Sequence, residues 1–149
     1  MRRLSWRDPR PLGRARAAAQ SSVELAALFA LLLPIVLGIV DLGRAYFAYD
    51  VLVHAVNEGA RYGSIDRSTA NVVAAVQSAA GTLGIASGDV TVACFSGSAA
   101  AATTCSSMLI GDTVQVGASV VFRPVTPLIG ALLPGGTLTI GATTRRSFQ

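Results

Sequence analysis

The chain has 149 residues, of which 52% are hydrophobic and only 13% are charged, and its formal net charge is +4. All twelve basic residues are arginines: six precede residue 17 with one acid among them, and the other six face seven acids. This distribution leaves no basic surface over most of the chain, so nucleic-acid binding is not expected, and the absence of lysine excludes lysine-based catalysis.

A charge-free apolar run follows the arginine-rich leader. It begins at Leu25 and ends at Val40, and Val23 and residues 42–49 extend it toward the roughly 20 residues that span a bilayer. The run predicts a transmembrane helix. By the positive-inside rule the leader, residues 1–19, stays in the cytoplasm and the C-terminal part is exported.

A cleaved secretory signal peptide is the competing interpretation, because it also joins basic residues to an apolar core. Such a core has about 7 to 15 residues and ends at a small-x-small site. Here Asp41-Leu42-Gly43-Arg44 follows the run and offers no such site. A permanent helix is therefore favoured.

Ser21-Ser22-Val23-Glu24, just before the run, fits a capping box. In that motif Ser21 is the N-cap of the helix and Glu24 reaches back to its backbone N–H. An acid entering a membrane segment is also a functional candidate by default. Both roles of Glu24 stay open.

Four short motifs surround the run and reach into the sequence after it: Ala19-Gln20-Ser21-Ser22-Val23-Glu24-Leu25-Ala26, Leu33-Pro34, Gly38-Ile39-Val40-Asp41-Leu42-Gly43-Arg44 and residues 55–61. Together they resemble the TadE-like family of tight-adherence (Flp) pilus biogenesis proteins over residues 20–62. The resemblance implies a minor pilin-like or pilus-assembly protein of the bacterial cytoplasmic membrane. It also implies other pilin-like subunits and the assembly machinery as partners, and a place in the membrane or on the cell surface.

The same resemblance implies a prepilin-type signal, cut on the cytoplasmic side by a prepilin peptidase. Carried over, the cut falls between Ala19, where such signals usually have glycine, and Gln20. Glu24 then becomes the fifth residue of the mature chain. We expect its carboxylate to pair with the new α-amino group of a neighbouring subunit, since pairing offsets the desolvation of both charges. An uncleaved single-pass anchor with a partner-binding domain is the alternative.

Beyond the bilayer the helix is expected to continue to residue 62 as a stem. Pro34 should bend it, and Gly63 should end it. Asp41 and Arg44, three residues apart, can pair near the outer interface. Apolar residues repeat at a spacing of three to four and form one face of the stem: Leu52, Ala55, Val56, Gly59 and Ala60.

Residues 63–149 are expected to form an exported domain. Ser68 can cap a short helix that Gly81 and Gly84 end. Three strands are predicted at residues 90–95, 113–122 and 137–146, the second with clean alternation of apolar and polar residues. The fold class is therefore α+β, a long N-terminal helix on a small antiparallel sheet, with the stem completing the core.

Cys94 and Cys105 are the only cysteines. In an exported domain they predict a disulfide, worth about 3 kcal/mol by loop entropy. Metal binding is the weaker alternative, because two cysteines and the distant His54 fall short of a tetrahedral ligand set.

Residues 124–136 combine three prolines with several large apolar side chains. Prolines at this density predict irregular backbone. The segment is expected either to fold over the sheet as a loop or to expose an apolar patch for a partner or a membrane surface.

Motifs for catalysis are missing from the sequence. It has no glycine-rich nucleotide loop, no cluster of metal ligands and no nucleophile elbow, and its single histidine lies on the stem. We therefore expect no enzyme activity, no cofactor and no small-molecule substrate.

Overall fold

A computed structural model describes residues 12–97 and 102–149. The predicted leader falls outside the described residues at positions 1–11. The chain divides into two compact units, Met1–Leu37 and Gly38–Gln149. Helix α1, Leu12–Gly63, contributes to both.

The first unit contains the beginning of α1 and most of the apolar run. Helix α1 starts at Leu12 and passes through Ser21, so the predicted helix start and N-cap at Ser21 are wrong for the full-length chain. Arginine and alanine, which fill residues 14–19, are strong helix formers and carry the helix upstream. Pro34 lies inside α1 without ending it.

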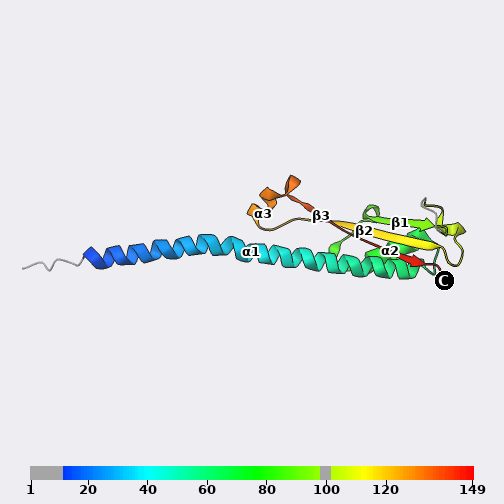
Figure 1. The fold of residues 1–149 in the computed structure, drawn as a ribbon, viewed down its shortest axis with the longest axis horizontal. Coiled ribbons are helices and arrows are strands. Elements are labelled where there is room, and N and C mark those ends of the chain that lie inside the picture. The colour runs from blue at the N-terminus through cyan, green and yellow to red at the C-terminus, as the bar shows by residue number, and fades with distance from the viewer. Residues whose placement is uncertain (1–11, 98–101) are drawn as a thin grey trace, which may run out of the picture. The chain divides into compact units, whose positions relative to one another are not determined.

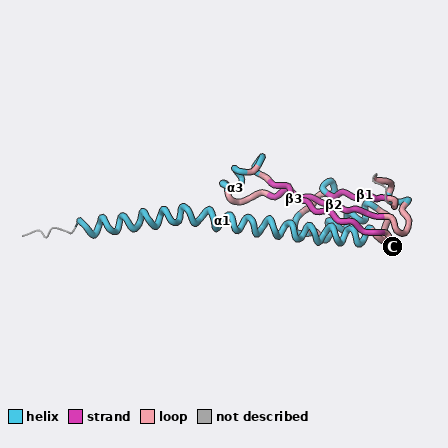
Figure 2. Tube along the Cα trace, in the orientation of Figure 1, coloured by secondary structure: helices cyan, strands magenta, loops and turns pink. Residues whose placement is uncertain are grey.

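The second unit contains the rest of α1 and a three-stranded antiparallel sheet in the order β1-β2-β3 (Figures 1 and 2). The strands are β1, Val90–Phe95, β2, Thr113–Phe122, and β3, Leu138–Ser147. The first two match the predicted ranges, and the third is shifted by one residue. The α+β fold class is confirmed.

Shorter helices connect these elements. Helix α2, Thr69–Ala79, follows Ser68, whose side chain makes no capping hydrogen bond. A 3₁₀ turn at Gly81–Leu83 then ends at Gly84, whose φ of 61° is left-handed and favours glycine. Two more 3₁₀ turns lie at Ser87–Asp89 and Cys105–Ser107. Helix α3, Pro127–Leu132, and a 3₁₀ turn at Pro134–Gly136 join β2 to β3.

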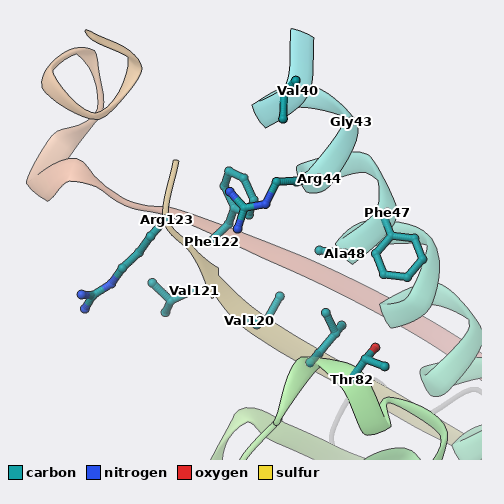
Figure 3. A pocket seen from close by; sticks show the side chains of 11 residues that line it. Val40, Gly43, Arg44, Phe47, Ala48, Thr82, Val120, Val121, Phe122 and Arg123 are labelled. Atoms are coloured by element: carbon teal, nitrogen blue, oxygen red, sulfur yellow. The ribbon is translucent and has the colours of Figure 1, made fainter. Parts of the chain in front are cut away.

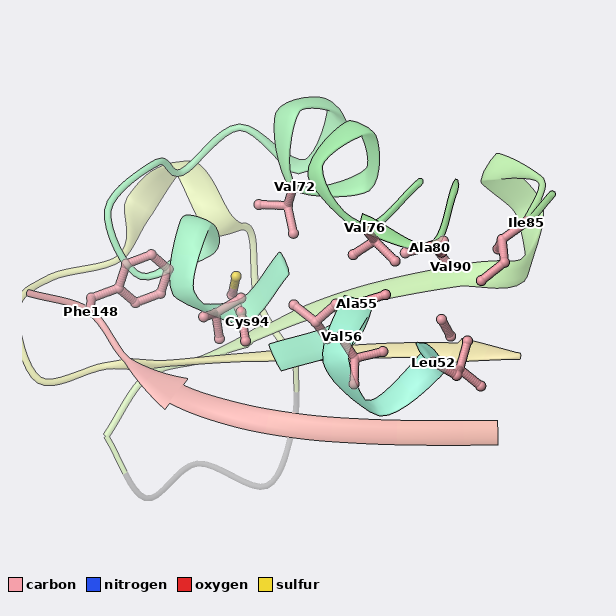
Figure 4. Packing of buried hydrophobic residues seen from close by; sticks show 14 of the residues in the cluster. Leu52, Ala55, Val56, Val72, Val76, Ala80, Ile85, Val90, Cys94 and Phe148 are labelled. Atoms are coloured by element: carbon pink, nitrogen blue, oxygen red, sulfur yellow. The ribbon is translucent and has the colours of Figure 1, made fainter. Parts of the chain in front are cut away.

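The core of the second unit lies between the sheet and the two helices α1 and α2 (Figure 4). The predicted apolar face of the stem is buried there, which confirms that the stem completes the core. Helix α1, helix α2 and strand β2 each contribute fully buried side chains: Leu52, Val56, Val72, Val76, Val114 and Val116.

Two glycines let α1 approach its neighbours closely. A Cβ on Gly59 would overlap Val76 Cγ2 of α2, and one on Gly63 would lie 3.1 Å from Val72 Cγ2. Gly63 is also the last residue of α1, as predicted. These small residues therefore serve packing within the chain.

Strand β2 runs along α1 in the opposite direction. Its start lies against the end of α1, where a Cβ on Gly63 would be 3.4 Å from Val114 Cγ2. Its last residue, Phe122, lies beside Arg44, with the guanidinium carbon 5.4 Å from the ring centre. Residues 44–63 of a helix span about 28 Å, and residues 114–122 of a strand span about 27 Å, so the two lengths match.

Candidate functional site

The predicted processing site lies on α1. The Ala19–Gln20 peptide bond is part of the continuous helix, and Gln20 is exposed. Gln20 Nε2 donates a hydrogen bond of 3.3 Å to Glu24 Oε1, one turn further on. Glu24 is exposed as well, so its carboxylate is accessible to a second partner.

The apolar run presents its side chains outward. Leu25, Leu31 and Ile39 are 55%, 67% and 65% exposed. Helix Gln20–Gly63 is long and apolar enough to cross a membrane, with a window of mean hydropathy 2.6 of which none is buried in the structure. Apolar surface on this scale favours burial in lipid or against another chain.

Asp41, directly after the run, is buried, with its side chain 3% exposed. Arg44 Nη1 donates to its Oδ1 over 3.2 Å, which confirms the predicted pair. Asp41 also accepts backbone N–H bonds from Val125 at 2.9 Å and Thr126 at 2.8 Å. The carboxylate thus ties α1 to the segment before α3, a contact that nothing in the sequence had indicated.

Arg44 forms one wall of an open pocket of about 600 Å³ (Figure 3). Its guanidinium lies over the Phe122 ring as a cation–π pair. Gly43 also lines this pocket, and a Cβ added to it would have nothing within 4 Å. The other lining residues are mostly apolar: Val40, Phe47, Ala48, Thr82, Leu83, Val120, Val121 and Arg123.

A second pocket, of about 340 Å³ and almost wholly apolar, is lined by residues of α1 and of the β2–β3 connection. Gly38 belongs to its wall, and a Cβ there would lie 3.7 Å from Ile129 Cδ1 of α3. The irregular backbone predicted for residues 124–136 is wrong for α3, because Pro127 stands in the first turn of that helix, where its missing N–H costs nothing. The segment lies against α1 instead of across the sheet.

Cys94 and Cys105 form the predicted disulfide, with Cα atoms 5.2 Å apart. Asp112 organises the same loop, since its carboxylate accepts N–H bonds from Leu109 at 2.8 Å and Gly97 at 2.9 Å. These two bonds, with a smaller contribution from the Ser96 hydroxyl, lower the pKa of Asp112. Among the described residues no group of three or more His, Cys, Asp or Glu could hold a metal ion.

Part of helix α1 matches a known protein family. Residues 19–61 match the TadE-like protein family. The match confirms the resemblance drawn from the motifs and has nearly the same bounds. No curated protein and no solved structure gives a significant match to the chain.

The TadE-like segment contains the predicted cleavage site, the apolar run and Asp41 with Arg44. It also contains the stem face that packs in the core of the second unit, up to Ala60. The sheet, the disulfide and the α3 region lie beyond the matched residues. The family match therefore covers the helix and its attachment to the rest of the chain.

Proposed function

We propose that this protein is a pilin-like subunit or assembly component of a tight-adherence (Flp) pilus, inserted in the bacterial cytoplasmic membrane by α1. The coincidence of the TadE-like match with an exposed apolar helix carries this proposal. Its role is structural: α1 inserts in the membrane and the C-terminal unit contacts other pilus components. Catalysis has no part in it.

The charge distribution supports one orientation. The six leader arginines lie on one side of the run, and few arginines follow it directly. The positive-inside rule then puts the leader in the cytoplasm and the chain beyond the apolar run on the outer side. An exported second unit also suits its disulfide, since such bonds persist in oxidising compartments.

The geometry around Glu24 supports a subunit contact after cleavage. In the uncut chain its carboxylate accepts an exposed hydrogen bond of 3.3 Å from the Gln20 side chain. A cut before Gln20 creates a cationic α-amino group at the cytoplasmic end of the helix. Within a bundle of such helices, the Glu24 carboxylate of one subunit neutralises the amine of the next.

An uncleaved single-pass anchor is the second candidate, and the continuity of α1 favours it. The peptide bond between Ala19 and Gln20 is helical in the full-length chain, so a peptidase that needs extended backbone must first unwind this turn. In this function the C-terminal unit binds a partner in the envelope and Glu24 only supports the helix.

The N-terminus and intact mass of the protein from membranes of its own host test the proposal. A chain beginning at Gln20 supports the pilin-like subunit. A chain beginning at Met1, in cells whose peptidase cuts a control prepilin, refutes processing and supports the anchor.

Variants of Glu24 test the subunit contact separately. Glu24→Ala and Glu24→Gln should both reduce co-isolation with other pilin-like subunits, because both remove the charge. Asp50→Asn, which neutralises another exposed acid of α1, is the matched control. Undiminished assembly of both Glu24 variants would contradict the pairing.

A further inference from the structure

The β2–β3 connection has an unusual composition for an exposed region. Between Arg123 and Arg145 the chain contains no charged residue. Two of its large apolar side chains are among the most exposed in the C-terminal unit: Val125 is 68% and Leu132 is 79% exposed. Apolar side chains that gather on one uncharged projection indicate a contact surface.

This connection lies beside the end of the apolar run. Ile129 of α3 packs at Gly38, and the pocket between them is also lined by Leu42 and Ala45. Figure 1 shows α3 beyond the end of the sheet and next to α1. Gly38 is part of the proposed membrane span, so the α3 segment, defined here as residues 124–133, lies at the level of the last turn of that span.

Three backbone amides of the α3 segment have hydrogen-bond partners that suit such a position. The N–H groups of Val125 and Thr126 both bond to Asp41, and the charge of Asp41 is neutralised by Arg44. Further along, Gly130 N–H donates to Thr126 C=O at 3.0 Å. Backbone groups paired in this way cost little when water is withdrawn from them.

Two arginines border the segment on the side of the sheet. Arg123 immediately precedes it, and Arg44 is half exposed above Asp41. Both side chains line the larger pocket (Figure 3). Arginines next to an apolar surface place their charge among lipid phosphates while their stems cover hydrocarbon.

We propose that the α3 segment inserts into the outer leaflet of the membrane, at its interface with water, as a second membrane contact beside α1. Val125 and Leu132 then face lipid, and Arg44 and Arg123 face the headgroups. The inference rests on the proposed span of α1. It gives the C-terminal unit a defined orientation on the bilayer, because two points of contact restrict rotation about the helix axis.

Tryptophan fluorescence in vesicles tests this with the full chain. In a Trp6→Phe background, Leu132→Trp reports on the α3 segment and Leu31→Trp on the middle of the apolar run. Ile110→Trp is the matched control, since Ile110 is 81% exposed and lies between the disulfide and β2 in the sequence. The vesicles contain phosphatidylcholine and phosphatidylglycerol, with part of the phosphatidylcholine brominated either near the headgroup or near the middle of the chains.

We expect Leu132→Trp to lose emission intensity, and more with shallow than with deep bromine. Leu31→Trp should show the reverse order, and Ile110→Trp should lose none. Val125→Trp is a second reporter on the α3 segment, and an intact disulfide with an unchanged circular dichroism spectrum checks folding.

Two other results would overturn the inference and can be told apart. If Leu31→Trp is quenched while both α3 reporters match Ile110→Trp, α1 spans the membrane but the α3 segment does not insert. The exposed surface of the segment would then bind a protein partner. If Leu31→Trp also escapes quenching, the span fails, and the inference fails with it.

Discussion

Substituting Gly59 by alanine tests the packing that joins the stem to the C-terminal unit. Gly59 is buried on α1, opposite α2 and β2. The added Cβ would overlap Val76 Cγ2 and lie 3.4 Å from Val116 Cγ1. Because both neighbours are buried core residues, relief requires a shift of the helices or of their rotamers.

Two opposing terms set the size of the effect. Overpacking of a well-filled core costs about 1–3 kcal/mol. Replacing glycine by alanine inside a helix recovers about 1 kcal/mol. The free energy of unfolding should therefore fall by up to about 2 kcal/mol, which for a unit of this size lowers the melting temperature by up to about 8 °C.

Gly43→Ala is the matched control, since Gly43 is also inside α1 but has nothing within 4 Å of its added Cβ. We expect this variant to gain about 1 kcal/mol. Both variants are compared by urea unfolding of the full chain in detergent, followed by circular dichroism. Val76→Ala combined with Gly59→Ala should cost less than the sum of the single changes, because it opens the space that the new methyl group needs.

A Gly59→Ala variant that stabilises the protein as much as Gly43→Ala does would contradict this prediction. The two positions would then share the same environment, and the close approach of α1 to α2 would not exist in solution. Additive single and double variants would lead to the same conclusion.

Three further predictions concern the hydrogen bonds and the crosslink of the C-terminal unit. Asp41→Asn should speed hydrogen exchange of the Val125 amide about tenfold, because a charged acceptor is lost. The lowered pKa of Asp112 stabilises the fold at pH values above the pKa of an unfolded aspartate, about 4. This contribution should disappear as the pH falls through the lower, folded pKa, and Asp112→Asn should flatten the acid limb of a stability-versus-pH curve. Replacing Cys94 and Cys105 by serine should lower the urea-unfolding free energy by about 3 kcal/mol.

Each of these has its own control. Asp50→Asn removes an exposed acid of α1 and should leave hydrogen exchange near α3 unchanged; equal effects of the two variants would point to net charge instead of the specific contact. An acid limb of unaltered slope in Asp112→Asn would assign acid sensitivity to other carboxylates. For the disulfide, the wild-type protein with reductant should match the double serine variant, and a stability unaffected by either treatment would contradict the role of the crosslink.

Local patterns in the sequence were sufficient for most of the fold. The alternation in residues 113–122 identified β2, because successive side chains of a strand face opposite sides. The three-to-four spacing after Leu52 identified the buried face of the stem for the equivalent reason in helices. The two cysteines, in a domain that the sequence predicts to be exported, were enough to predict their disulfide.

Contacts between residues far apart in the sequence could not be predicted from local patterns. Asp41 binds the amides of Val125 and Thr126, which are 84 and 85 residues away in the sequence, and no local pattern marks such a pair. The helix start was misplaced because Ser21 and Glu24 fit a capping box, whereas the arginines and alanines upstream have enough helix propensity to continue past it. The short helix α3 was not predicted, because the prolines of this segment were taken as helix breakers. One of them, Pro127, occupies the first turn of the helix, where proline is tolerated.

The lengthwise alignment of β2 on α1 has a mechanical consequence. In the proposed role as a filament subunit the protein is pulled, and tension that enters through the stem reaches the sheet along the direction in which β2 and α1 lie side by side. Under such shear loading all contacts between Gly63 and Arg44 carry the load at the same time. In a crosswise attachment the contacts would break one after another from one end. The force needed to detach the stem therefore reflects the whole buried face at once, and the rate of forced unfolding, not only the equilibrium stability, is the property that this geometry improves.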